Sequence, residues 1–141
     1  MTAGDPRAMS GDERAARMNE LALQGRCCTQ ILVQVALDEL GDDNEQMVEA
    51  VGALCVGMFS GGDCGALSGG ALAMALRGER PFDGGLVSEL ADWFRGEYGS
   101  LVCDEILGGD PAARYTKCPP IMVRTYEVAM QILVDHGKLS P

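Results

Sequence analysis

The chain has 141 residues, of which 47% are hydrophobic, so it is long enough to bury the core of one domain. Its formal net charge of -10, with only 11 Lys and Arg residues, would repel a phosphate backbone, so we expect no nucleic-acid partner. No apolar run approaches the length of a membrane span, and no signal peptide is evident. We therefore expect a cytoplasmic protein that does not insert into a membrane. In that compartment, six cysteines favour metal or redox chemistry over a disulfide framework.

The N-terminal residues divide into a tail and the start of a domain. Residues 1–9 are predicted to be a flexible tail, and residues 10–141 a single helical domain. Ser10 is expected to cap the first helix, because Glu13 stands three residues later, as in a capping box. Gly25 is expected to end this helix.

Two further helices are predicted before the centre of the chain. The second begins at about residues 26–28 and ends at the turn of residues 41–44. The third is expected to extend to Met58, because apolar residues recur at three- and four-residue steps, which is typical of a buried helix face. This stripe consists of Met47, Val48, Val51, Leu54, Cys55 and Met58.

The glycine-rich stretch of residues 61–76 is the most unusual part of the chain. Asp63 is expected to cap a helix with Cys64 at its first position, where the positive end of the helix dipole favours a thiolate. Gly65 and Gly69 lie on one face of that helix, although each glycine costs about 1 kcal/mol relative to alanine. The bare face is therefore predicted to pack closely against another backbone or to give a bound group access to the Cys64 sulfur.

The second half of the chain continues the helical pattern. A loop at residues 80–85 is followed by a helix over residues 86–94, which we expect to break at Gly96 and Gly99. No alternation of period two is long enough for a strand. The fold class is therefore predicted to be all-α, a compact bundle of about six or seven helices.

The last two predicted helices each begin near a cysteine. Ser100 is expected to cap a short helix with Cys103 in its first turn. Cys118 is expected at the N-cap of the final helix, because proline is favoured in a first helical turn and Pro119 follows directly. Gly137 is expected to end that helix.

Four cysteines share a predicted position in the first turn of a helix or at its cap. Thiolates are stabilised there by the helix dipole and by unpaired N–H groups. Four thiolates suit zinc or an iron–sulfur cluster, but ordinary zinc modules bring their ligands in closely spaced pairs, which this chain lacks. The four residues are Cys28, Cys64, Cys103 and Cys118. Of the other two cysteines, Cys55 is expected to be a core residue outside the site, and Cys27 either a substitute ligand or an exposed thiol.

The order and spacing of these cysteines resemble the C_GCAxxG_C_C family, which is named for its cysteine pattern. Residues 64–69, Cys-Gly-Ala-Leu-Ser-Gly, match the central motif of that family. Cys28 resembles its early cysteine, and Cys103 and Cys118 its two later ones. The resemblance implies a small helical redox protein that holds an iron–sulfur cluster and is related to a domain of the split-Soret cytochromes. The Cys-x-x-Cys-His segments that bind haem in those cytochromes are absent here.

The first hypothesis is an electron-transfer protein or oxidoreductase accessory, rather than a stand-alone enzyme. Its four patterned cysteines would bind a cluster, [2Fe-2S] in preference to [4Fe-4S], with Gly65 and Gly69 beside it. The sulfurs must then converge at one place in the bundle. We expect an oxidoreductase or electron-transfer partner, and the glycine face is compatible with a homodimer.

Two alternatives stand beside this hypothesis. In the first, no metal is bound and a cysteine pair cycles between dithiol and disulfide, with Cys64 as the nucleophile and Cys28 or Cys118 as its partner. In the second, the four cysteines hold a structural zinc ion in an interaction protein.

Overall fold

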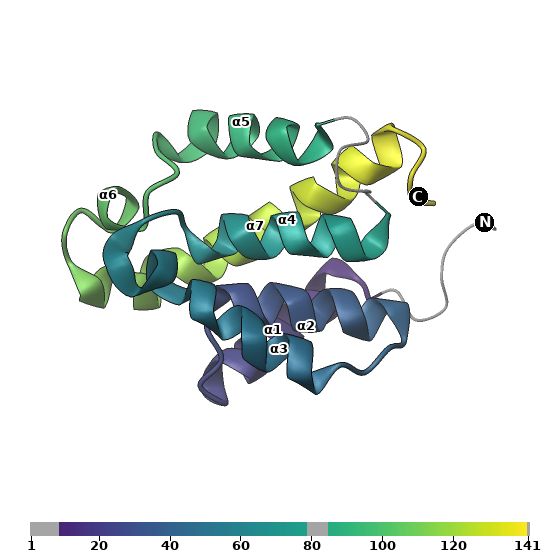
Figure 1. The fold of residues 1–141 in the computed structure, drawn as a ribbon, viewed down its shortest axis with the longest axis horizontal. Helices are drawn as coiled ribbons and strands as arrows, with labels where there is room; N and C mark the ends of the chain where they lie inside the picture. The colour runs from purple at the N-terminus through teal and green to yellow at the C-terminus, as the bar shows by residue number, and fades with distance from the viewer. Residues whose placement is uncertain (1–8, 79–84, 141) are drawn as a thin grey trace.

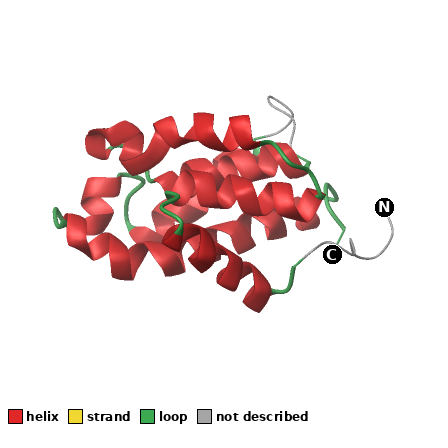
Figure 2. Cartoon of the chain, turned by 90° about the horizontal axis from the view of Figure 1, so that it is seen from below, coloured by secondary structure: helices red, strands yellow, loops and turns green. Residues whose placement is uncertain are grey.

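A computed structural model describes residues 9–78 and 85–140. This part of the chain forms α-helices joined by short turns, with a single isolated β-bridge and no strand (Figures 1 and 2). The α-helices are α1 (Gly11–Leu23), α2 (Cys28–Leu40), α3 (Glu45–Val51), α4 (Gly65–Arg77), α5 (Leu86–Tyr98), α6 (Cys103–Leu107) and α7 (Arg114–Asp135). The shorter helical turns are η1 (Gly52–Leu54), η2 (Gly57–Gly61) and η3 (Pro111–Ala113). The predicted all-α fold class is confirmed. No helix in the described residues is both long and apolar enough to cross a membrane.

Helix α4 lies inside the bundle and packs against α2, α5 and α7. In Figure 1, α4 and α7 lie between α5 on one side and the group of α1, α2 and α3 on the other. The core between these helices is made of aliphatic, methionine and aromatic side chains. Its largest fully buried members include Tyr126, Phe94, Met18, Ile31, Leu32, Leu37, Met74, Leu90 and Leu133.

The glycine face of α4 packs directly against α2. A Cβ atom added to Gly65 would lie 2.9 Å from Thr29 Oγ1 and 3.3 Å from Cys28 Cβ, and one added to Gly69 would lie 2.9 Å from Leu32 Cβ. The Thr29 hydroxyl also donates a hydrogen bond to the Gly65 carbonyl, at 3.1 Å. The predicted close packing against a neighbouring backbone is confirmed. It places the first residue of α2 beside the first residue of α4.

Replacing Gly69 by valine is expected to destabilise the protein by about 3 kcal/mol, because the new side chain would force α2 away from α4. The matched control is Gly96→Val. Gly96 lies inside α5, and a Cβ added there meets nothing within 4 Å, so its stability should change by less than about 0.5 kcal/mol. Urea unfolding followed by circular dichroism measures both effects. Equal losses in the two variants would contradict the role given to the glycine face.

The predicted third helix is wrong beyond Val51. Helix α3 ends there, and the chain passes through η1 to Cys55, which has an extended backbone. Val56, Met58 and Phe59 then adopt left-handed conformations, with φ of 52°, 58° and 56°. The apolar stripe therefore does not stay on one helix face, and Met58 is 68% exposed instead of buried. The pairing of Cys55 with another cysteine, described below, accounts for the change of direction.

Two helix boundaries in the second half also differ from prediction. Helix α5 continues through Gly96 and ends at Gly99, which adopts the left-handed conformation typical of a helix C-cap. Helix α7 begins at Arg114, so Cys118 lies inside the helix and not at its N-cap, and Pro119 is internal. The first turn of α7 is exposed to solvent, so the backbone carbonyls that lose a partner at the proline can be hydrated.

A buried carboxylate ties the ends of three helices together. Glu39 is 1% exposed and forms ion pairs with Arg14 and Arg77, each at 3.1 Å. The Tyr126 hydroxyl donates a hydrogen bond to the same carboxylate. The Met9 N–H also donates to Glu39, at 3.0 Å. Four polar contacts therefore compensate for the burial of one charge.

Two predicted segments fall largely outside the described residues. These are the tail of residues 1–9, of which only Met9 is described, and the loop of residues 80–85, of which only Gly85 is described. Met9 is packed against the core, and its N–H donates a hydrogen bond to Glu39. The division of the chain into a tail and a single domain stays a prediction.

Candidate redox site

Cys64 and Cys103 are held together by a short backbone bridge. The Cys64 N–H donates to the Leu101 carbonyl at 2.7 Å, and the Cys103 N–H donates to the Gly62 carbonyl at 2.6 Å. The residues that precede the two cysteines form an isolated antiparallel β-bridge. Figure 1 shows α6 at one end of the bundle, beside the turn that leads into α4. The bridge therefore joins the starts of α4 and α6.

Cys64 itself is the N-cap residue of α4, in place of the predicted Asp63. The backbone N–H groups of Ala66 and Leu67 donate to its sulfur and lower its pKa, as expected at a helix N-terminus. Burial has the larger effect, because Cys64 is only 5% exposed, and it raises the pKa to about 11. Without a bound cation, Cys64 is therefore a neutral thiol at pH 7, and not the thiolate that its position in the sequence suggested.

Cys28 and Cys118 form a second pair, between the start of α2 and the first turns of α7. A hydrogen bond with Cys118, followed by burial, raises the pKa of Cys28. The same hydrogen bond, together with the positive charge of Arg114 and against the effect of burial, lowers the pKa of Cys118 to about 7. Cys28 is thus the donor, and Cys118 is the thiol of this pair that ionises near neutral pH.

The four free cysteines of the chain lie close enough to one another for all their charges to interact. The charges of Cys64, Cys103 and Cys118 each raise the pKa of Cys28, and those of Cys103 and Cys118 raise the pKa of Cys64. Cys118 also raises the pKa of Cys103, where burial is the larger cause. Every pair among the four is therefore near enough for its charges to interact, although α2, α4, α6 and α7 contribute one cysteine each.

The reduced thiols are not arranged around a single point. In the described residues, which include all six cysteines, no three His, Cys, Asp or Glu side chains are grouped so that they could hold one metal ion. Gly65 and Gly69 face α2, so their predicted contact with a cofactor stays a prediction, as do the ligand roles of the four cysteines.

Comparison with family models decides which protein family the chain belongs to. Residues 26–132, more than half of the chain, match the model described as "Putative redox-active protein (C_GCAxxG_C_C)". The chain belongs to this family. Comparison with curated proteins and with solved structures gives no match. The matched segment includes all four free cysteines, and its central cysteine, Cys64, is the N-cap residue of α4.

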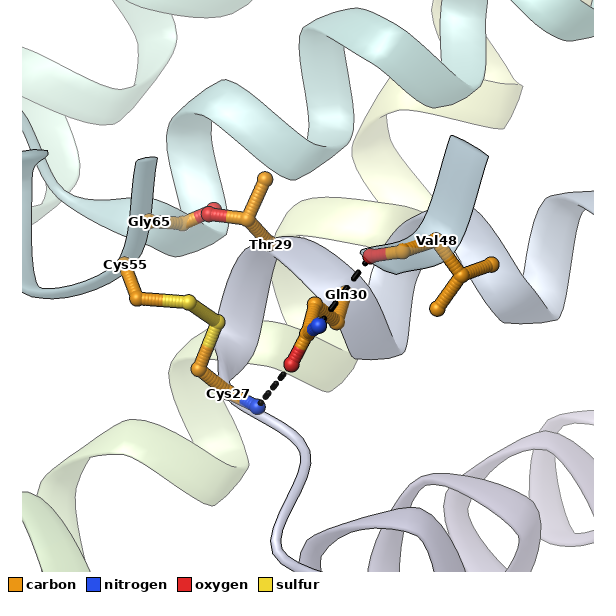
Figure 3. Close-up of a disulfide and its surroundings, with 6 residues drawn as sticks. All are labelled: Cys27, Thr29, Gln30, Val48, Cys55 and Gly65. Atoms are coloured by element: carbon orange, nitrogen blue, oxygen red, sulfur yellow. Dashed lines mark hydrogen bonds between the residues drawn. A yellow bond between two sulfur atoms is a disulfide. The ribbon is translucent and has the colours of Figure 1, made fainter. Parts of the chain in front are cut away.

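The two cysteines outside the C_GCAxxG_C_C pattern pair with each other. Cys27 and Cys55 are joined as a disulfide, with their Cα atoms 5.9 Å apart (Figure 3). Cys55 is buried and outside the four-cysteine group, as predicted, but it is more than a core residue. Cys27 is neither a free ligand nor an exposed thiol. Sequence analysis missed this pair, because only the fold brings together two cysteines that are 28 residues apart.

Alkylation of the metal-free protein is expected to occur first at Cys118. At pH 7.5 most of its sulfur is thiolate, whereas Cys64, with a pKa of about 11, is almost entirely protonated. Even after allowing for the weaker nucleophilicity of a low-pKa thiolate, Cys118 should react with iodoacetamide at least about tenfold faster than Cys64. The rate should rise with pH through about 7, as measured by mass spectrometry of tryptic peptides.

Arg114→Gln should slow the reaction of Cys118 near pH 7, because it removes the cation that lowers the pKa. Arg95→Gln is the control, since Arg95 pairs with the exposed Asp92 on α5. Faster alkylation of Cys64 than of Cys118 would contradict this order of reactivity.

Proposed function

We propose that Cys28, Cys64, Cys103 and Cys118 bind an iron–sulfur cluster and that the chain is a small electron-transfer protein serving an oxidoreductase. The observation that carries this proposal is the mutual coupling of the only four free cysteines, which come from four separate helices. Membership of a family of redox-active proteins supports it independently.

The residues present fit such a group chemically. Thiolates are the ligands that iron–sulfur clusters take, and when bound such a cluster supplies a one-electron couple. The N–H groups of Ala66 and Leu67 already point at the Cys64 sulfur, and donors of this kind tune the potential of a cluster. Burial of Cys64 and Cys103 limits the access of water to two of the four ligands.

Membership of a family of redox-active proteins favours a cluster over a structural zinc ion, because zinc does not change its oxidation state in proteins, whereas an iron–sulfur cluster does.

Anaerobic reconstitution with iron and sulfide tests the proposal. We expect brown protein with visible absorption bands, and the ratio of iron to acid-labile sulfide distinguishes [2Fe-2S], our first expectation, from [4Fe-4S]. Colourless protein after reconstitution, or one zinc ion per chain that ample iron and sulfide do not replace, would refute it.

A second candidate function, metal-free dithiol chemistry, is favoured by the hydrogen bond between Cys28 and Cys118. In this scheme the Cys118 thiolate attacks an external disulfide, and Cys28 then displaces the mixed disulfide. The external disulfide gains two electrons and two protons and leaves as two thiols. Cys64 is less suited to be the nucleophile, because burial keeps it protonated.

A thiol count separates this function from the first. The folded, metal-free protein is treated with oxidised glutathione and then unfolded for the count. The number of reactive thiols should fall by two, and peptide mapping should find a Cys28–Cys118 disulfide. An unchanged count at these two residues would exclude the dithiol function.

A further inference from the structure

The disulfide between Cys27 and Cys55 lies next to the candidate redox site without belonging to it. Cys27 is the N-cap residue of α2 and directly precedes Cys28. Cys55 directly precedes the turn that leads to Cys64. The disulfide therefore joins the two chain segments that supply Cys28 and Cys64 to the four-cysteine group.

The Cys27 end of the disulfide is fixed by other contacts as well. The Gln30 side-chain oxygen accepts a hydrogen bond from the Cys27 N–H at 3.2 Å, and its amide nitrogen donates to the Val48 carbonyl at 3.0 Å (Figure 3). The neighbouring Arg26 pairs with Glu49 at 2.6 Å. The start of α2 is thus attached to α3 whether or not the disulfide is present.

The Cys55 end continues into a strained and exposed turn. Val56, Met58 and Phe59 occupy the left-handed region, which is costly for residues other than glycine. Met58 and Phe59 are also 68% and 71% exposed, so burial of their side chains does not compensate for this cost. Such a conformation persists only where its surroundings enforce it.

Contacts at both ends enforce this conformation. At the far end, the Gly62 N–H donates to the Gly57 carbonyl at 3.1 Å, and the Cys103 N–H donates to the Gly62 carbonyl. The Asp104 carboxylate lies against Gly61, where an added Cβ would come within 2.1 Å of it. At the near end, the disulfide attaches Cys55 to the fixed start of α2.

We propose that Cys27 and Cys55 are a second redox couple, a dithiol/disulfide switch that holds the turn of residues 56–61 when oxidised and releases it when reduced. This inference rests on Cys27 and Cys55 and the turn alone. It applies whether or not the four family cysteines carry a cluster.

The reductant is a dithiol, either a small molecule or a protein. One of its thiolates attacks the Cys27 sulfur, because Cys27 is half-buried while Cys55 is only 5% exposed, and the Cys55 sulfur leaves and takes up a proton. The second thiol of the reductant then displaces Cys27 from the mixed disulfide. Two electrons and two protons pass to the protein, which gains two thiols, and the reductant becomes a disulfide.

The test applies chymotrypsin to the full metal-free chain, after equilibration with reduced or oxidised dithiothreitol. Reduction should accelerate cleavage after Phe59 by at least about tenfold, since proteolysis follows the population of the open segment. Cleavage after Tyr115, which is equally exposed at 71% but lies in α7, is the internal reference and should not change. Iodoacetamide labelling and peptide mapping should show Cys27 and Cys55 becoming reactive together.

A Cys27→Ser/Cys55→Ser variant should be cleaved after Phe59 at the rate of the reduced protein under both conditions. The Cys28→Ser/Cys118→Ser variant is the matched control and should keep the response, because it leaves the Cys27–Cys55 pair intact. Three results would overturn the proposal. They are equal cleavage after Phe59 in both redox states, a disulfide that dithiothreitol reduces only in unfolded protein, and a reduced pair that oxidised glutathione does not convert back to the disulfide. Reconstitution of a cluster is measured separately, so its failure leaves these outcomes unaffected.

Discussion

Replacing Cys64 by serine is expected to abolish binding of an iron–sulfur cluster. The change removes one of the four soft ligands proposed above, at the sulfur that receives the N–H groups of Ala66 and Leu67. Loss of an outer-shell partner alone commonly costs roughly 10–100-fold in metal affinity, so loss of a ligand should cost more. Iron and acid-labile sulfide per chain after anaerobic reconstitution, together with the visible spectrum, measure the effect.

Ser68→Ala is the matched control for this variant. Ser68 lies one turn further along α4, and its hydroxyl makes only a long contact of 3.4 Å, to the Cys64 carbonyl. It should retain wild-type iron content, which shows that a changed side chain in α4 is not itself harmful. A full and stable cluster in Cys64→Ser would remove Cys64 from the ligand set.

Replacing Glu39 by alanine is expected to destabilise the protein by about 3–5 kcal/mol, without any change at the cysteines. The substitution leaves Arg77, whose side chain is 5% exposed, and Arg14 without a counter-charge, and the buried Tyr126 hydroxyl without its acceptor. Asp92→Ala is the control, because the Asp92–Arg95 pair is exposed and its loss should cost less than about 1 kcal/mol. Urea denaturation gives both values, and similar small losses would show that the buried network contributes little.

The same network gives the protein a defined response to acid. Burial raises the pKa of Glu39, but its hydrogen bonds with Tyr126 and Arg14 and the charge of Arg14 together lower it below its ordinary value. Its stabilising contribution is therefore complete above the unfolded glutamate pKa of about 4.3 and is lost as the pH falls through the lower pKa of the folded protein. The acid-dependent loss of stability should be smaller in Glu39→Gln than in the wild type.

The helical fold was predictable because its signals are local. The capping box of Ser10 and Glu13 and the glycine that follows α2, Gly41, each act within one turn of chain, and both occur where expected. The Cys118 prediction failed because the rule that places proline at helix starts describes a tendency. The exposed first turn of α7 accommodates Pro119 inside the helix.

The four cysteines that are free in the structure could be singled out from the sequence, but their electrostatics could not. The family pattern identified the four cysteines, and their coupling agrees with one location. Burial, which depends on the whole bundle, decided that Cys118 and not Cys64 ionises near pH 7. The Cys27–Cys55 disulfide and the Glu39 network were missed for a related reason. Their partners lie far away in the sequence and carry no local pattern.

The placement of the four free cysteines on α2, α4, α6 and α7 has a mechanical consequence. Any group bound by all four sulfurs would close the intervening chain into a set of loops, as a multi-branched cross-link does. Cross-links restrict the conformations of the unfolded chain. A group that binds only the native protein also stabilises the native state relative to the unfolded one. The loaded protein should therefore unfold as one unit, because none of the four helices α2, α4, α6 and α7 can leave without breaking a bond to the shared group.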